Sequence, residues 1–172
     1  VYDMKKILFA ALEAVPFMKT GGLADVTGSL PKYFDKKNYD VRVILPKYVC
    51  MEERWKGQLH FLCHFYVNLS WRKQYVGIFE TTYDGITYYL VDNEFYFAGN
   101  APYNNIYEDV EKFAFFSKAV LEALPYLDFC PDIIHCHDWQ TGLLPVFLRT
   151  LYGDEEYYTG IKTVFSIHNL KF

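Results

Sequence analysis

The sequence lacks a long apolar run, a basic cluster and any paired cysteine spacing. A membrane-spanning helix needs about 20 consecutive apolar residues, and this absence argues against a membrane protein. A net charge of −4 without a basic run argues against a nucleic-acid partner. The apolar stretch 5–14 is short and runs into Pro16, so it predicts a buried strand and not a signal peptide. The four cysteines then favour free thiols in a reducing cytoplasm.

What the sequence does contain is apolar and aromatic material for a core. Of its 172 residues, 52% are hydrophobic and 20% are aromatic, mostly Tyr and Phe. That length and composition predict one folded domain over residues 1–172. Tyrosine also suits surfaces that face sugars, because its ring covers C–H groups while its hydroxyl hydrogen-bonds.

The first part of the chain has a strand–helix–strand pattern. Residues 6–13 form a nearly continuous apolar run, which is typical of a strand buried on both faces of a parallel sheet. Helical spacing follows over 24–37, where Pro31 predicts a break or kink. A second apolar strand is predicted at 40–45, and the three elements together predict a right-handed βαβ unit.

The middle of the chain predicts antiparallel strands at 58–69, 74–82 and 86–92. Asp84-Gly85 lies between apolar arms and is a strong hairpin signal. Apolar spacing over 109–124 then predicts a helix.

The α/β pattern resumes with a strand at 131–137, a helix at 142–151 and a strand at 163–167. The fold class expected is therefore α/β, with a Rossmann-like, doubly wound, mostly parallel sheet and an antiparallel hairpin region. A last strand without a following helix is an unusual end for such a domain. We therefore expect the domain to be truncated.

Three polar clusters follow predicted parallel strands, where open α/β sheets place their ligands. The first cluster spans residues 19–25. Gly21 and Gly22 let the backbone approach a ligand, and the following helix start and Lys19 add positive charge. These features suit a phosphate or diphosphate, although a tight turn with an incidental lysine is an equal alternative. The pattern is neither a P-loop nor the dinucleotide fingerprint.

The second cluster spans residues 135–139. His135 and His137 alternate along a strand and should point to one face, with Asp138 at the strand end. Asp138 can bind sugar hydroxyls, and Trp139 can stack on a sugar ring. Two alternatives remain open: a buried histidine pair with Asp138 capping the next helix, or a metal site.

The third cluster contains His168 and Asn169, after the last predicted strand. A neutral imidazole at this position can donate a hydrogen bond to a sugar hydroxyl. A single histidine after a strand is more often structural. Its place at the same sheet edge as the other two clusters favours a role in binding.

These motifs, KTGGLAD at 19–25, HCHDW at 135–139 and HN at 168–169, resemble the N-terminal domain of bacterial glycogen synthases and plant starch synthases. The resemblance extends to residues 7–13 and 112–121 and covers nearly the whole chain. It implies the N-terminal half of a glycosyltransferase-B architecture, with a C-terminal nucleotide-binding domain absent from this chain. The implied activity is transfer of glucose from ADP-glucose to the non-reducing end of an α-1,4-glucan with retention.

The resemblance also implies roles for individual residues and no metal or other cofactor. Lys19, Gly21 and Gly22 would bind the donor, with Asp25 organising their loop. Asp138 and His168 would hold the transferred glucose as the catalytic residues. Tyr103 and Trp139 would face the acceptor glucan.

Lacking the second domain's nucleotide pocket, the 172-residue chain alone is expected to be inactive. The preference for ADP over UDP comes from the resemblance alone. Two other functions stay open: a metal-dependent hydrolase using His135, His137, Asp138 and His168, and a non-catalytic carbohydrate-binding domain.

Overall fold

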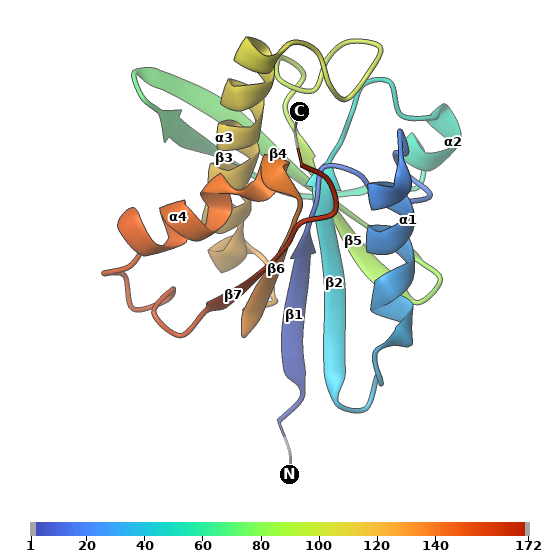
Figure 1. Cartoon of the computed structure of the whole chain (residues 1–172), viewed down its shortest axis with the longest axis vertical. Helices are drawn as coiled ribbons and strands as arrows, with labels where there is room; N and C mark the ends of the chain where they lie inside the picture. Colours follow the sequence, from blue (N-terminus) through green and yellow to red (C-terminus); the bar gives the residue numbers. More distant parts are fainter. Residues whose placement is uncertain (1–2, 171–172) are drawn as a thin grey trace.

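Within residues 3–170, which the computed structural model describes, one seven-stranded sheet runs through the molecule in the order β3-β4-β5-β2-β1-β6-β7 (Figure 1). The strands are β1 (Lys5–Ala10), β2 (Tyr39–Pro46), β3 (His60–Leu69), β4 (Arg72–Tyr83), β5 (Ile86–Asp92), β6 (Ile133–His137) and β7 (Lys162–Ser166). The α-helices are α1 (Gly22–Ser29), α2 (Glu53–Lys56), α3 (Ile106–Ala123) and α4 (Leu143–Thr150). Three short 3₁₀ segments are η1 (Leu30–Tyr33), η2 (Leu124–Tyr126) and η3 (Trp139–Thr141).

The sheet is parallel on one side and antiparallel on the other. β5, β2, β1, β6 and β7 pair in parallel, while β4 pairs antiparallel with both β3 and β5. This arrangement confirms the mostly parallel Rossmann-like sheet and the antiparallel hairpin region. The predicted hairpin turn is also present, with positive φ at Asp84 (49°) and Gly85 (74°), as a tight two-residue turn between twisted strands requires.

Two predicted elements end well before their predicted last residues. The first strand ends at Ala10 and not at Glu13, because its ladder with β2 ends at the pair Ala10 and Ile44. The helix predicted over 24–37 is split, since α1 ends at Ser29 and η1 begins at Leu30. Pro31 lies in this 3₁₀ segment, as expected of a residue that cannot donate the next helical hydrogen bond.

Helices cover both faces of the sheet and create two apolar cores. On one face, Leu8, Ala10 and Ile134 belong to a core that includes α3 and α4 side chains. On the other face, Ile7, Phe9 and Val43 pack with residues of η1 and with Phe17, which lies between β1 and α1. Figure 1 shows α3 and α4 on one side of the parallel strands and α1 on the other. β1 lies between both cores, which explains its continuous apolar sequence.

In the part of the chain that the structure describes, no helix combines the length and apolar character needed to span a bilayer.

Candidate functional site

The strand order reverses direction at the carboxyl ends of β1 and β6. From β1 the chain first passes to β2 on one side, and it later returns to β6 on the other side of β1. Such a reversal is a topological switch point, where loops diverge and open α/β sheets bind ligands. The loops after β1, β6 and β7 carry the three polar clusters predicted from the sequence.

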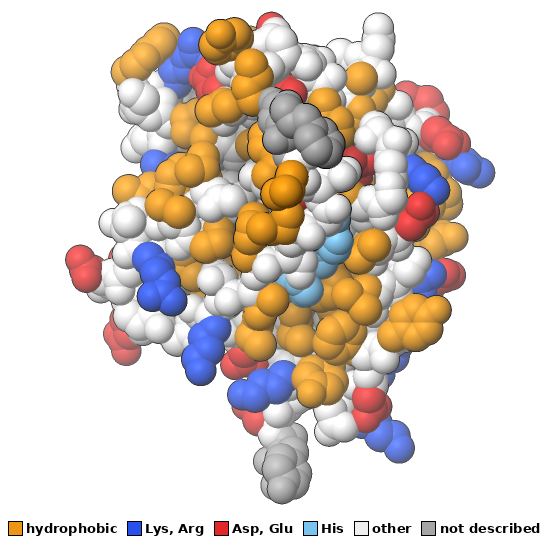
Figure 2. Space-filling view, in the orientation of Figure 1, with side chains coloured by type: hydrophobic (Ala, Val, Ile, Leu, Met, Phe, Trp, Pro, Cys, Tyr) orange, Lys and Arg blue, Asp and Glu red, His pale blue; other side chains and the backbone are white. Residues whose placement is uncertain are grey.

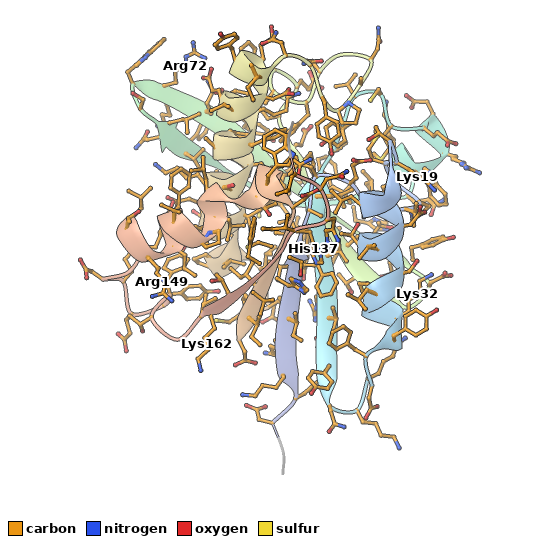
Figure 3. The ribbon with its side chains drawn as sticks, in the orientation of Figure 1. Lys19, Lys32, Arg72, His137, Arg149 and Lys162 are labelled. Atoms are coloured by element: carbon orange, nitrogen blue, oxygen red, sulfur yellow. The ribbon has the colours of Figure 1, made fainter. Side chains whose placement is uncertain are left out.

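The loop after β1 presents Lys19 at the surface (Figure 3). Lys19 Nζ lies 2.8 Å from Asp25 in an ion pair whose side chains are each 53% exposed. Gly21 is extended at the start of α1, and a Cβ added to Gly21 or Gly22 would meet no atom within 4 Å. The space above these glycines and the unpaired N–H groups of the first helical turn suit an anionic ligand.

Glu13 binds this loop through hydrogen bonds, although the sequence analysis assigned it no role. Its side chain is only 3% exposed. Oε1 accepts hydrogen bonds from both the backbone N–H and the hydroxyl of Thr20, and Oε2 accepts one from Tyr103 Oη at 2.6 Å. Glu13 therefore ties the Lys19 loop to the loop that carries Tyr103.

The Tyr103 loop is held by a buried ion pair at the start of α3. Lys112 Nζ lies 3.3 Å from Asp109 and donates to the Pro102 carbonyl at 2.9 Å. Asp109 in turn accepts from the Asn104 backbone N–H at 3.0 Å. The backbone on both sides of Tyr103 is therefore held in place.

Tyr103 and Trp139 meet through a shared aromatic neighbour. Phe113 lies edge-on to both rings, with centroids 6.1 Å from Tyr103 and 5.2 Å from Trp139. Burial raises the pKa of Tyr103, with further contributions from Tyr48 and from its acceptor Glu13. The phenol therefore stays protonated and acts as a donor to Glu13.

Asp138 lies at the end of β6 with a backbone that only glycine adopts readily, at φ 68° and ψ 171°. It is 3% exposed. Its Oδ1 accepts from the backbone N–H of Trp139 at 3.1 Å and of Asn169 at 3.2 Å. Asp138 therefore caps the following helical segment, η3, which is one of the alternatives left open by the sequence. The same oxygen also fixes the segment beyond β7.

The histidines form a connected group beside β1. His135 and His137 point to one face, as predicted, and their rings stack with centroids 4.0 Å apart. His137 Nδ1 lies 3.0 Å from Nε2 of the exposed His168. Burial, together with His135 and His168, lowers the pKa of His137 to about 3. Figure 2 shows histidine side chains at this face among hydrophobic ones.

These histidines do not form a metal centre. Among residues 3–170, no group of three or more His, Cys, Asp or Glu side chains is arranged to hold a metal ion. The ring nitrogens of His137 and His168 that face each other are joined by a hydrogen bond, and His135 Nε2 lies 2.7 Å from Ser166 Oγ. The metal-dependent hydrolase alternative therefore has no ligand set in this part of the chain.

The sequence did contain a signal for Glu13. It is the one charged residue in the apolar run 7–14 that leads out of β1. A carboxylate buried in such a run needs hydrogen-bond partners, and those partners come from the nearby loops. Thr20 and Asn169 were part of recognised motifs, but their contacts to Glu13 and Asp138 depend on tertiary structure.

The sequence over residues 6–172 matches the family model of the starch synthase catalytic domain. A glycogen synthase of Lachnoclostridium phytofermentans is 66% identical over 169 residues, which are 98% of this chain and 35% of that protein. A glycogen synthase of Lachnospira eligens is 61% identical over 169 residues, again 98% of this chain and 35% of the relative.

Among solved structures, this chain resembles the catalytic domain of starch synthase IV from Arabidopsis thaliana, which was determined bound to ADP and acarbose. The TM-score is 0.83 at 29% identity, and the match covers 96% of this chain and 34% of that chain. The chain therefore spans about a third of the length of these relatives.

Proposed function

The chain belongs to the starch synthase catalytic domain family, and from this membership we propose that it is the first domain of a glycogen-synthesising enzyme. The reaction is transfer of glucose from ADP-glucose to the non-reducing end of an α-1,4-glucan, with retention of anomeric configuration. Residues 1–172 form the acceptor-side Rossmann-like domain. The nucleotide-binding domain lies outside this chain, which matches about a third of its relatives' length.

One observation carries this proposal: three polar clusters converge at the switch point between β1 and β6. Glu13 joins the Lys19 loop to Tyr103, and Asp138 joins the end of β6 to the segment after β7. An anion-binding loop and a carboxylate at the same switch point match the charges of glycosyl transfer. A non-catalytic carbohydrate-binding domain has no need of the anion-binding side.

The Lys19 loop binds the diphosphate of the donor. In glycosyl transfer the departing diphosphate gains negative charge, which fixed positive groups and N–H donors stabilise. Lys19 supplies the charge, and the backbone at Gly21 and Gly22 lets the diphosphate approach α1. Asp25 holds Lys19 in place through the exposed ion pair.

Asp138 and His168 hold the transferred glucose. Positive charge develops on the sugar ring as the bond to the diphosphate breaks, and a nearby carboxylate stabilises it. The acceptor hydroxyl attacks from the face that the diphosphate leaves. No protein nucleophile is needed, in contrast to a retaining glycosidase with two carboxylates.

Tyr103 and Trp139 lie toward the acceptor glucan. Their rings flank Phe113 and provide the flat apolar surface on which a sugar can stack. A cytoplasmic location accords with the four free cysteines, because reducing compartments keep thiols unpaired.

The test is a glucosyl-transfer assay with ADP-glucose or UDP-glucose and glycogen, in the presence of EDTA. We expect a protein of the relatives' full length to transfer glucose from ADP-glucose, and residues 1–172 alone to be inactive. Lys19→Ala should lower kcat/KM of the full-length protein by roughly 10- to 100-fold, the effect of losing one charged hydrogen bond.

Lys32→Ala is the matched control, because Lys32 forms a similar ion pair with Asp84 at 3.0 Å but lies in η1, beyond the last turn of α1 (Figure 3). Equal losses in both variants, or transfer that requires a divalent metal, would contradict the proposal. Transfer by residues 1–172 alone would contradict the assignment of the nucleotide pocket to another domain.

A further inference from the structure

The His137 imidazole is fully buried at the end of β6, yet it is not one of the residues assigned to the substrate. Its ring contacts both His135, stacked at 4.0 Å, and Phe9, whose centroid is 4.7 Å away. Its single side-chain hydrogen bond among the described residues joins Nδ1 to Nε2 of His168 at 3.0 Å. The two rings are almost parallel, at 8°.

The other nitrogen of His137 determines where the hydrogen in this bond lies. Nε2 is buried and has no hydrogen-bond partner among the described residues. A neutral imidazole has one N–H donor and one acceptor nitrogen. In protein backbones, buried N–H groups without an acceptor are rarer than buried carbonyls without a donor, and we extend this order to the ring nitrogens of His137. The lower-energy tautomer therefore leaves Nε2 unprotonated and places the hydrogen on Nδ1.

The charge state of His137 is consistent with this tautomer. Burial is the main cause that lowers its pKa to about 3, and the neighbouring rings of His135 and His168 lower it further. His137 is therefore neutral at physiological pH. With its hydrogen on Nδ1, it donates to His168 Nε2, and that nitrogen must be an acceptor.

We propose that His137 is a positioning residue that fixes His168 in the tautomer with hydrogen on Nδ1. His168 is exposed, and its Nδ1 makes no hydrogen bond within residues 3–170, so this N–H is available to a ligand at the ends of β6 and β7. That the ligand is a hydroxyl of the transferred glucose rests on the proposed function; the tautomer itself does not.

His135 fixes the plane of the buried ring. It is half-buried, its Nε2 lies 2.7 Å from Ser166 Oγ, and its ring covers one side of His137. Ser166 is the last residue of β7, the strand that leads to His168. The stacked pair belongs to β6 and contacts β7 through Ser166 and the segment after β7 through His168.

The direct test is long-range ¹H–¹⁵N NMR of the full chain labelled with ¹⁵N-histidine, since protonated and unprotonated ring nitrogens have distinct shifts. The exposed His60 and His64 of β3 provide internal references. We expect both His137 and His168 to carry hydrogen on Nδ1. A wild-type spectrum with hydrogen on Nε2 of either residue overturns the proposal without any variant.

Two substitutions separate the hydrogen bond from packing. His137→Asn keeps an amide donor near the position of Nδ1, whereas His137→Phe keeps a ring and has no donor. We expect His168 to remain Nδ1-protonated in the Asn variant and to become a mixture of tautomers in the Phe variant. An unchanged His168 tautomer in a folded His137→Phe chain would contradict the proposal.

Glucosyl transfer tests the consequence for function. In the full-length protein, His137→Phe should lower kcat/KM roughly two- to tenfold, as for one lost hydrogen bond. His137→Asn should restore kcat/KM to within about twofold of wild type, because the donor is retained. If wild type transfers no glucose, the proposed function fails while the NMR result stands. If wild type transfers glucose but the tautomers differ from expectation, only this inference fails.

Discussion

Tyr103 donates its phenolic hydrogen to Glu13 across 2.6 Å, although 90 positions separate them in the sequence. The bond joins the segment after β1 to the loop before α3. Because Glu13 also accepts from Thr20, one buried carboxylate sets the relative positions of the two loops.

Glu13→Gln should destabilise the chain and misplace both loops. A glutamine has a single oxygen, and its NH₂ group would face a donor where the carboxylate offers an acceptor. We expect the free energy of unfolding to fall by about 1–3 kcal/mol, the cost of a buried polar group left without a partner. Tyr103→Phe removes one of the three bonds and should cost about 1 kcal/mol. Urea unfolding measures both values. Equal losses would contradict the conclusion that Glu13 holds both loops.

Asp138→Asn should abolish most of the activity without unfolding the chain. Asparagine keeps the oxygen that accepts from the backbone of Trp139 and Asn169, and it has nearly the same shape as the aspartate that already adopts this backbone. Only the charge is lost. We expect kcat of the full-length protein to fall about 100-fold or more, the scale of one electrostatic contact in a transition state. Wild-type turnover with a neutral side chain would exclude a role for the carboxylate charge.

The backbone strain at Asp138 can be measured separately. Asp138→Gly and Asp138→Ala both remove the carboxylate and its two hydrogen bonds, but only glycine adopts φ 68° and ψ 171° readily. The strain is about 1–3 kcal/mol, and the greater unfolded-state freedom of glycine offsets part of it. The glycine variant should therefore be more stable than the alanine variant by about 1 kcal/mol. Thermal unfolding of the two chains makes the comparison, and a more stable alanine variant would refute the strain.

The stability of the chain should fall as the pH falls below about 6.5, the ordinary histidine pKa. The folded-state pKa of His137 is lowered to about 3, so in this window the unfolded state binds a proton that the folded state does not. Stability therefore rises with pH between these values, by up to about 1.4 kcal/mol per unit for one group. His135, whose pKa burial also lowers, adds to the same trend.

Urea unfolding at several pH values gives this slope. In His137→Phe the slope should be smaller, whatever the absolute stability of that variant. The titratable side chains that lower the pKa of His137 are His135 and His168. His135→Asn is therefore the second variant in this comparison. Identical slopes in wild type and His137→Phe would show that His137 does not titrate as proposed.

Gly28→Ala should weaken the docking of α1 against the segment after β1. A Cβ at Gly28 would lie 2.6 Å from the carbonyl oxygen of Val15, which is backbone and cannot rotate away. We expect a loss of about 1–3 kcal/mol from overpacking. Gly160→Ala is the control, because a Cβ there would meet no atom within 4 Å. Equal stability of both variants in thermal unfolding would show that α1 can shift freely.

Sequence patterns predicted the order and type of the main elements because each has a local cause. Apolar runs predicted β1, β2 and β6, and the Asp84-Gly85 turn predicted the β4–β5 hairpin. Element ends were less accurate. α3 begins at Ile106, before the predicted Asp109, because the Asn105 side chain accepts from the backbone of Tyr107 and Glu108.

The site was predicted only as far as strand ends could place it. The sequence predicted that the clusters at 19–25, 135–139 and 168–169 would share one sheet edge. It did not predict the contacts that join them, such as Thr20 to Glu13 or Asn169 to Asp138, because these depend on how loops distant in sequence meet. The binding and catalytic roles of these residues stay predictions.

The pairing of β1 with β6 also affects how the chain folds during its synthesis. Ile7 pairs with Ile133, so one edge of β1 waits for 126 further residues to leave the ribosome. At bacterial or eukaryotic rates that takes roughly 6 to 25 s, far longer than a hairpin needs to form. The β3–β4–β5 meander can form in that interval, and the site at the ends of β1 and β6 is complete only when β6 arrives. A chaperone that shields β1 on the nascent chain should therefore raise the yield of folded protein.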